Sequence, residues 1–177
     1  MGKRLLYEVS LLVRDLPSSK VGASYELQAH SGTVPSGPLR DTARAMSQKN
    51  LELVRSIYAD WERGDFSSAE WAHSDIEFAF EDGPEPGRWR GREAMSRRYG
   101  DWLRGFEAFR AEPERYLVVD EHRILVLVHN SGRGRTSGLE FDSLTVANFF
   151  EIEDGLVTRL VIYWDRDRAL ADLSLSE

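Results

Sequence analysis

The chain has 177 residues and no cysteine, and its formal net charge is −7 at pH 7. The length suits one domain with a sizeable core, and the missing cysteines exclude disulfides, thiolate metal sites and cysteine nucleophiles. An acidic chain is a poor partner for nucleic acid or an anionic membrane, and no apolar run approaches the ~18 residues of a membrane span, so we expect a cytoplasmic protein without either partner.

Residues 1–45 differ from the rest of the chain. They hold six basic and four acidic residues, a net of +2, whereas residues 46–177 hold 17 basic and 26 acidic residues, a net of −9. Glycine, serine and proline interrupt any sustained period, although Leu5 to Leu16 could form a short strand or helix. We interpret this segment as a disordered or loosely packed arm before a domain at 46–177. Alternatively, Met46 is the natural start, or the arm packs on a partner.

Three helices are predicted in the first half of the domain, over residues 47–64, 65–72 and about 91–109. Ser47 or Asn50 can cap the first helix, and a glycine ends it because glycine takes the left-handed conformation easily. Apolar residues at spacings of three and four define the buried faces of the first and third helices. These residues are Leu51, Val54, Ile57, Tyr58 and Trp61 in the first, and Met95, Tyr99, Trp102 and Phe106 in the third.

The remaining pattern is that of strands. Alternation over residues 76–80 predicts a half-buried strand, and Pro84, Pro86 and Gly87 make the next segment a loop. Four strands then follow, joined by hairpins, and Asp165 can cap a last short helix ending near Leu173. The strands are expected at 115–120, 123–130, 139–153 and 156–164, with a flexible loop at 132–138 and a tight turn at 154–155. Hairpin-linked strands with helices on one face make an α+β domain.

The order of these elements is similar to that of a known superfamily. The segments that match are Tyr58-Ala59-Asp60-Trp61-Glu62-Arg63-Gly64-Asp65, His73-Ser74-Asp75-Ile76-Glu77-Phe78, Trp89-Arg90-Gly91-Arg92-Glu93-Ala94, Glu153-Asp154-Gly155-Leu156-Val157 and Tyr163-Trp164-Asp165-Arg166. With them, residues 47–173 resemble SnoaL-like, NTF2-like domains. The resemblance implies a cone-shaped α+β fold, in which three N-terminal helices wrap a curved antiparallel sheet around a pocket.

Members of this superfamily include polyketide cyclases, ketosteroid isomerases, limonene-epoxide hydrolases, dehydratases and non-catalytic binding modules. The three main catalytic positions of the isomerases match Ile57, Phe80 and Ala147, so the isomerase chemistry does not carry over. A second-tier tyrosine does match, at Tyr99. The arginine and two aspartates of the epoxide hydrolases find no clear positions here.

The resemblance, with strand alternation, predicts which side chains face the pocket. His129 and Tyr99 are the candidate catalytic groups, because an imidazole can shuttle a proton near neutral pH. A satisfied core or strand-end histidine is the alternative for His129, and a filled core is the alternative to an open pocket. The candidate substrate-binding residues are Ile57, Trp61, Phe78, Phe80, Trp102, Thr145, Ala147 and Trp164. Ser143, Leu160 and Ile162 are also expected to face inward, and Asp142 and Asn148 to face away.

Other kinds of site find little support. The glycine-rich segment 132–138 lies between two strands, whereas a phosphate loop needs a following helix. The four histidines show no paired spacing for a metal, and Thr136 stands where a nucleophile elbow needs serine. We therefore expect no metal and no cofactor.

Two classes of function remain. The first is a cofactor-independent cyclase, isomerase, dehydratase or hydrolase of a small hydrophobic substrate, and we lean slightly towards it. The second is a non-catalytic ligand-binding or protein-assembly module. We also expect a homodimer, because Val126, Val146 and Phe150 would lie on the sheet face that the helices leave uncovered.

Overall fold

The computed structural model describes residues 38–175, with side chains from residue 42 onward. Its elements are α2 (Pro38–Trp61), β1 (Ala72–Phe80), β2 (Gly87–Arg90), α3 (Arg92–Leu103), β3 (Phe106–Val118), β4 (Arg123–Gly134), β5 (Glu140–Glu153), β6 (Leu156–Tyr163) and α4 (Arg166–Asp172). The segment 5–16, which could form a short strand or helix, lies outside the described residues.

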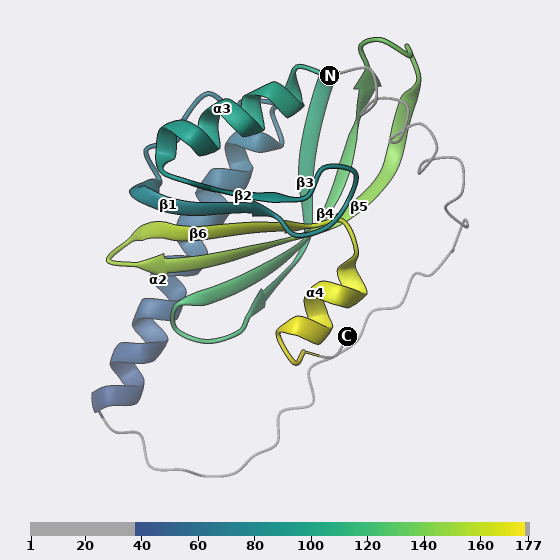
Figure 1. Ribbon diagram of the computed structural model, residues 1–177. Helices are drawn as coiled ribbons and strands as arrows, with labels where there is room; N and C mark the ends of the chain where they lie inside the picture. Colours follow the sequence, from purple (N-terminus) through teal and green to yellow (C-terminus); the bar gives the residue numbers. More distant parts are fainter. Residues whose placement is uncertain (1–37, 176–177) are drawn as a thin grey trace.

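The strands form one curved sheet in the order β2-β1-β6-β5-β4-β3 (Figure 1). Every neighbouring pair is antiparallel except β1 and β6, which run parallel. A mixed α+β fold built on a curved sheet is what the sequence predicts, and the hairpin turn at Asp154 and Gly155 lies where expected.

Several element boundaries differ from the prediction. Helix α2 begins at Pro38, well before Ser47, so two of its turns lie in the segment expected to be an arm. The predicted helix over 65–72 is wrong: Asp65 accepts hydrogen bonds from Ser67 in a local turn instead. The loop after β1 is also followed by a short strand, β2, which the prolines and glycine there did not predict.

The third helix ends earlier than predicted. It stops at Leu103, and residues 106–118 form strand β3 along the edge of the sheet. Phe106 pairs with Gly134 of β4 and is buried, so it belongs to the core from a strand rather than from a helix. Its four-residue distance from Trp102 matched a helical period by coincidence, because pairing with β4 governs its conformation.

The two faces of the sheet are both covered. The concave face packs on α2 and α3, and the convex face carries a smaller apolar cluster against α4 (Figure 1). Asp165 caps α4 as predicted, because its carboxylate accepts hydrogen bonds from the backbone N–H groups of Asp167 and Arg168. The short helix α4 therefore covers apolar residues on the convex face of the sheet, whereas the sequence analysis expected one sheet face to stay uncovered.

This covering removes the reason given for a homodimer. Val126, Val146 and Phe150 face the concave core and are buried, so they cannot form a partner surface. Among the described residues, the exposed large apolar side chains are Met46, Val118 and Leu139. A homodimer stays a prediction, and the surface proposed for it is wrong.

Candidate functional site

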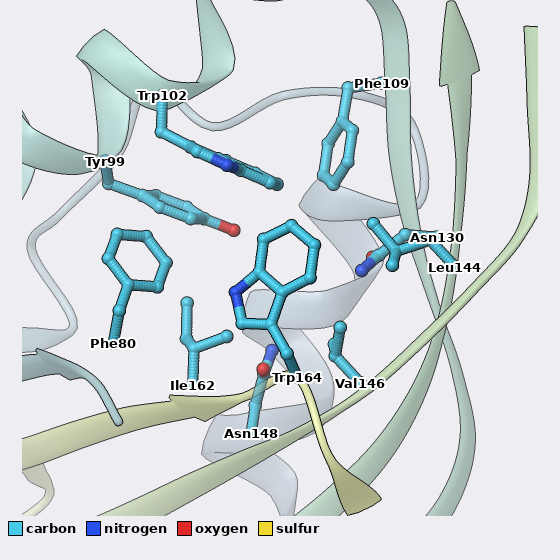
Figure 2. A pocket seen from close by; sticks show the side chains of 10 residues that line it. All are labelled: Phe80, Tyr99, Trp102, Phe109, Asn130, Leu144, Val146, Asn148, Ile162 and Trp164. Atoms are coloured by element: carbon cyan, nitrogen blue, oxygen red, sulfur yellow. The ribbon is translucent and has the colours of Figure 1, made fainter. Parts of the chain in front are cut away.

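A small inner cavity lies between α3 and the concave face of the sheet (Figure 2). Its volume is about 10 Å³, which is close to the space that one water molecule needs. Ten side chains line it: Phe80, Tyr99, Trp102, Phe109, Asn130, Leu144, Val146, Asn148, Ile162 and Trp164. The lining is mainly aromatic and aliphatic with few polar groups, a character typical of small-molecule sites.

Helix α3 supplies the aromatic roof. Tyr99 and Trp102 are three residues apart, so both side chains project from one face of the helix. Their rings stack with centroids 5.7 Å apart and an interplanar angle of 7°. Figure 2 shows the Tyr99 hydroxyl directed into the space between the roof and Trp164.

Trp164 fills much of the space below this roof. Its ring meets Trp102 edge to face, at 6.4 Å and 89°. The loop after β1 holds it there, because the Asp82 carboxylate accepts a hydrogen bond of 2.5 Å from the Trp164 backbone N–H. Gly83 lies directly against the indole, with a φ of +88°, and a Cβ atom there would be 2.5 Å from Trp164 Cδ1.

A second small space, the outer pocket, lies on the other side of this tryptophan. Pro84, Glu85 and Arg98 line it, together with three residues that also line the inner cavity. The shared residues are Phe80, Trp102 and Trp164. We call these three the aromatic partition, since they separate the inner cavity from the outer pocket.

The floor of the inner cavity carries a buried polar pair. Asn148 Nδ2 donates a 2.8 Å hydrogen bond to the Tyr58 hydroxyl of α2, and both residues are buried. Asn148 Oδ1 is buried without a partner among the described residues. Asn130 is the other amide on this floor and is also buried. The cavity is therefore apolar in its walls and polar at defined points.

Burial governs the protonation of the tyrosines around the cavity. It raises the pKa of Tyr99 above its ordinary value. It also raises the pKa of Tyr58, and the hydrogen bond with Asn148 acts in the opposite direction with a smaller effect. Both phenols therefore stay neutral at physiological pH and can donate hydrogen bonds.

Four of the ten candidate catalytic and substrate-binding residues line the inner cavity, and one further residue expected to face inward does so too. Tyr99, Phe80, Trp102 and Trp164 do so, as does Ile162. The other three predicted residues from the helices and β1 are buried in the main core beside the cavity without lining it. The three are Ile57, Trp61 and Phe78. The rings of Trp61 and Phe78 contact the Tyr99 ring.

The predicted position of His129 is wrong. Its neighbours Val128 and Asn130 face the concave side, so His129 points to the convex side. There it is partly exposed, and Nε2 lies 3.0 Å from Asp142 Oδ1, while Nδ1 lies 3.8 Å from Glu114 Oε1. An imidazole in this place cannot reach a ligand in the inner cavity.

The same error affects β5. Thr145 pairs with His129, and Ala147 belongs to the convex cluster, so neither lines the inner cavity as predicted. Val146 and Asn148 do so instead. The register between β5 and β6 shifts near Glu151, so counting residues from the hairpin turn gives the wrong face.

Asn148 was predicted to face away from the pocket, and that prediction is wrong; Phe109 is a second lining residue that was not predicted. Asn148 occupies an inward row with Leu144, Val146 and Phe150, and a lone amide in such a row is a usable signal. The opposite row carries Ser143 and Thr145 beside Ala147 and Phe149 and is less apolar, so the error arose from counting residues from the hairpin turn and not from the alternation itself. Phe109 was assigned to a helix and lies in β3.

Residues 38–175 contain neither a candidate metal site nor a helix that could span a membrane. No group of three histidine, aspartate or glutamate side chains there could hold a metal ion. No helix in this range is both long and apolar enough to cross a bilayer.

Several solved structures share this fold. Bal32a, from a soil-derived mobile gene cassette, is 25% identical over 67% of this chain and 90% of its own, with a TM-score of 0.55. A phenazine biosynthesis-related protein from Pseudomonas aeruginosa is 18% identical over 78% and 93%, with a TM-score of 0.58. An NTF2-like protein from Burkholderia pseudomallei is 16% identical over 70% and 95%, with a TM-score of 0.57.

The family comparison covers most of the domain. A search of curated proteins gave no match. The profile of the SnoaL-like domain matches residues 54–160, from the second half of α2 into β6, and so includes most of the cavity lining described above. This chain belongs to the family of SnoaL-like domains.

Proposed function

We propose that this protein binds a small, flat, mainly apolar molecule in the inner cavity. The observation that carries the proposal is the set of polar groups left without a partner inside an aromatic lining. Trp102 Nε1 and Asn148 Oδ1 are both buried and unpaired among the described residues. Leaving a buried polar group unpaired costs about 1–3 kcal/mol, so such groups usually serve a water molecule or a ligand.

Binding requires the aromatic partition to open. The inner cavity has room for about one water molecule, so a ligand must displace a side chain. Trp164 is the best candidate, because it is partly exposed and borders both spaces. Rotation of its indole would join the inner cavity to the outer pocket and leave a space of indole size.

A cofactor-independent enzyme is the second candidate function, and the Tyr99 hydroxyl, which has no hydrogen-bond partner among the described residues, favours it. A buried neutral phenol can donate a hydrogen bond to an oxygen on which charge develops. Among the described residues, no aspartate, glutamate or histidine lines the inner cavity. Catalysis there would accordingly rest on ligand orientation and hydrogen-bond donation, as a cyclisation or isomerisation can, rather than on a strong base.

The proposal is tested first with a plain apolar probe. Naphthalene should bind the wild-type chain with a Kd of about 1 mM or tighter, and should raise the melting temperature. Trp164→Ala should tighten binding, because it removes the side chain that fills the site. Trp71→Ala is the matched control, since Trp71 is a partly buried tryptophan that lines neither space.

Two results would contradict this proposal. One is the absence of naphthalene binding by wild type and Trp164→Ala alike. The other is equal tightening in Trp71→Ala, which would place binding elsewhere. Mass spectrometry of the denatured protein provides a direct complement, because a co-purified small molecule would identify the natural ligand.

A further inference from the structure

One turn of α3 presents three hydrogen-bond donors that meet no acceptor within the described part of the chain. Arg98 Nε and Trp102 Nε1 are buried and unpaired among the described residues. Tyr99 lies between them in sequence, and its hydroxyl makes no hydrogen bond with any residue in the range 38–175. All three side chains border the inner cavity or the outer pocket.

The surroundings hold these donors in place. The Arg98 guanidinium lies over the rings of Phe80 and Trp89, at 5.3 and 5.1 Å from their centroids. Its terminal nitrogen bonds Glu85 Oε2 at 2.7 Å, which leaves Nε free. Trp102 packs against five aromatic rings, and among the described residues no acceptor meets its N–H.

The chemistry of these groups defines the missing partner. The guanidinium and the indole N–H can donate hydrogen bonds but cannot accept them. The partner must therefore bring an acceptor, and an oxygen lone pair is the usual one. The unpaired acceptor Asn148 Oδ1 lies on the opposite side of the cavity, so the two ends of the site differ in polarity.

The charges around Arg98 favour a neutral ligand oxygen over a carboxylate oxygen. Glu85 is ion-paired with Arg98, so this turn of α3 carries little net positive charge. A carboxylate ligand would approach Glu85 as well as Arg98 and gain little from the pair. A neutral carbonyl oxygen would accept hydrogen bonds without that repulsion.

We propose that the α3 turn from Arg98 to Trp102 is a subsite for a neutral carbonyl oxygen of the bound molecule. The subsite rests on the proposed function, since the ligand body must occupy the space vacated by Trp164. Trp102 and Tyr99 determine specificity in it by donating to the oxygen. Arg98 supports the same oxygen from the outer pocket.

The test compares three probes that share one ring system. They are naphthalene, 2-acetylnaphthalene and 2-naphthoate, titrated against the full chain. The measured quantity is the ratio of the naphthalene Kd to the 2-acetylnaphthalene Kd. We expect this ratio to fall about 3- to 10-fold in Trp102→Phe and in Tyr99→Phe, because each variant loses one donor and keeps an aromatic ring at that position.

Tyr116→Phe is the matched control, since Tyr116 is a partly buried tyrosine that lines neither space. Its ratio should equal that of wild type. The indole N–H resonance of Trp102, assigned by its loss in Trp102→Phe, gives a readout in the unmodified protein. It should move downfield with 2-acetylnaphthalene and not with naphthalene.

The outcomes separate the two proposals. If all probes bind and neither the ratio nor the Trp102 resonance changes, the subsite is wrong while ligand binding stands. If 2-naphthoate binds best, and Arg98→Met abolishes that preference, the subsite recognises charge and the assignment to a neutral carbonyl is wrong. If no probe binds, the proposed function fails and the subsite fails with it.

Discussion

Asn148 and Tyr58 place a hydrogen-bonded pair inside an apolar interior, where Asn148 links the cavity floor to α2. A phenol hydroxyl both donates and accepts, so the Asn148 amide can turn over and keep its bond to Tyr58. In one orientation the amide presents an acceptor to the cavity, and in the other a donor. The floor of the site can therefore adapt to either kind of ligand group.

A substitution at Gly83 probes the contact between the loop after β1 and the indole of Trp164. A Cβ atom at Gly83 would overlap the indole, and the φ of +88° is unfavourable for any other residue. We expect Gly83→Ala to lower the free energy of unfolding by about 1–3 kcal/mol and to change the tryptophan emission, measured by urea unfolding and fluorescence.

Gly100→Ala is the control for that substitution. Gly100 lies within α3, and a Cβ there would meet no atom within 4 Å, so alanine should stabilise the protein by about 0.5–1 kcal/mol. In a Trp164→Ala background, Gly83→Ala should cost less than in wild type. An equal cost in both backgrounds would show that the indole and the loop are not in contact.

At the scale of elements, α2 shows how a helix can be anchored by its second half. Asn50 is buried and donates a 2.8 Å hydrogen bond to the Glu121 carbonyl, and the core residues Val54, Tyr58 and Trp61 follow it. The preceding turns are mostly exposed, with Met46 39% exposed. The first turns of α2 therefore contribute little to the core.

This anchoring predicts the effect of shortening the chain. A protein that starts at Met46 should melt within about 3 °C of one that starts at Pro38, because few core contacts are lost. Differential scanning calorimetry of the two proteins measures this directly. A much lower melting temperature, or insolubility, of the Met46-start protein would show that the first turns of α2 are structurally required.

At the scale of the whole molecule, buried tyrosines make stability depend on alkaline pH. Burial raises the pKa of Tyr116 to about 12, and it raises those of Tyr58 and Tyr99 above the ordinary value of 10.0. In the unfolded chain these phenols ionise from about pH 10, whereas in the fold they stay neutral. Their contribution to stability is thus complete below pH 10 and is lost as the pH rises above it.

Urea unfolding between pH 8 and 11 should reveal this loss. Above pH 10, each such tyrosine lowers the free energy of unfolding by up to about 1.4 kcal/mol per pH unit. Tyr99→Phe should reduce the slope relative to wild type, because phenylalanine cannot ionise in either state. The explanation is wrong if Tyr99→Phe and wild type lose stability in parallel.

The sequence determined the fold class through features that act locally. The apolar spacing in α2 and α3, the turn at Asp154 and Gly155, and the cap at Asp165 depend on neighbours along the chain. The turn and the cap lie where they were predicted, and both helices form, although α2 begins earlier and α3 ends earlier than predicted. The same local patterns, with the family resemblance, identified Tyr99, Trp102 and Trp164 as residues around the cavity.

Only the tertiary structure decided which face each strand presents. A bulge or a shift of one residue exchanges the two faces, so counting residues from the hairpin turns could not place Asn148 inside or His129 outside. The size of the cavity was equally beyond local pattern, since it depends on Trp164 being held by Asp82 and Gly83. Those contacts join segments about eighty residues apart, and only long-range packing creates them.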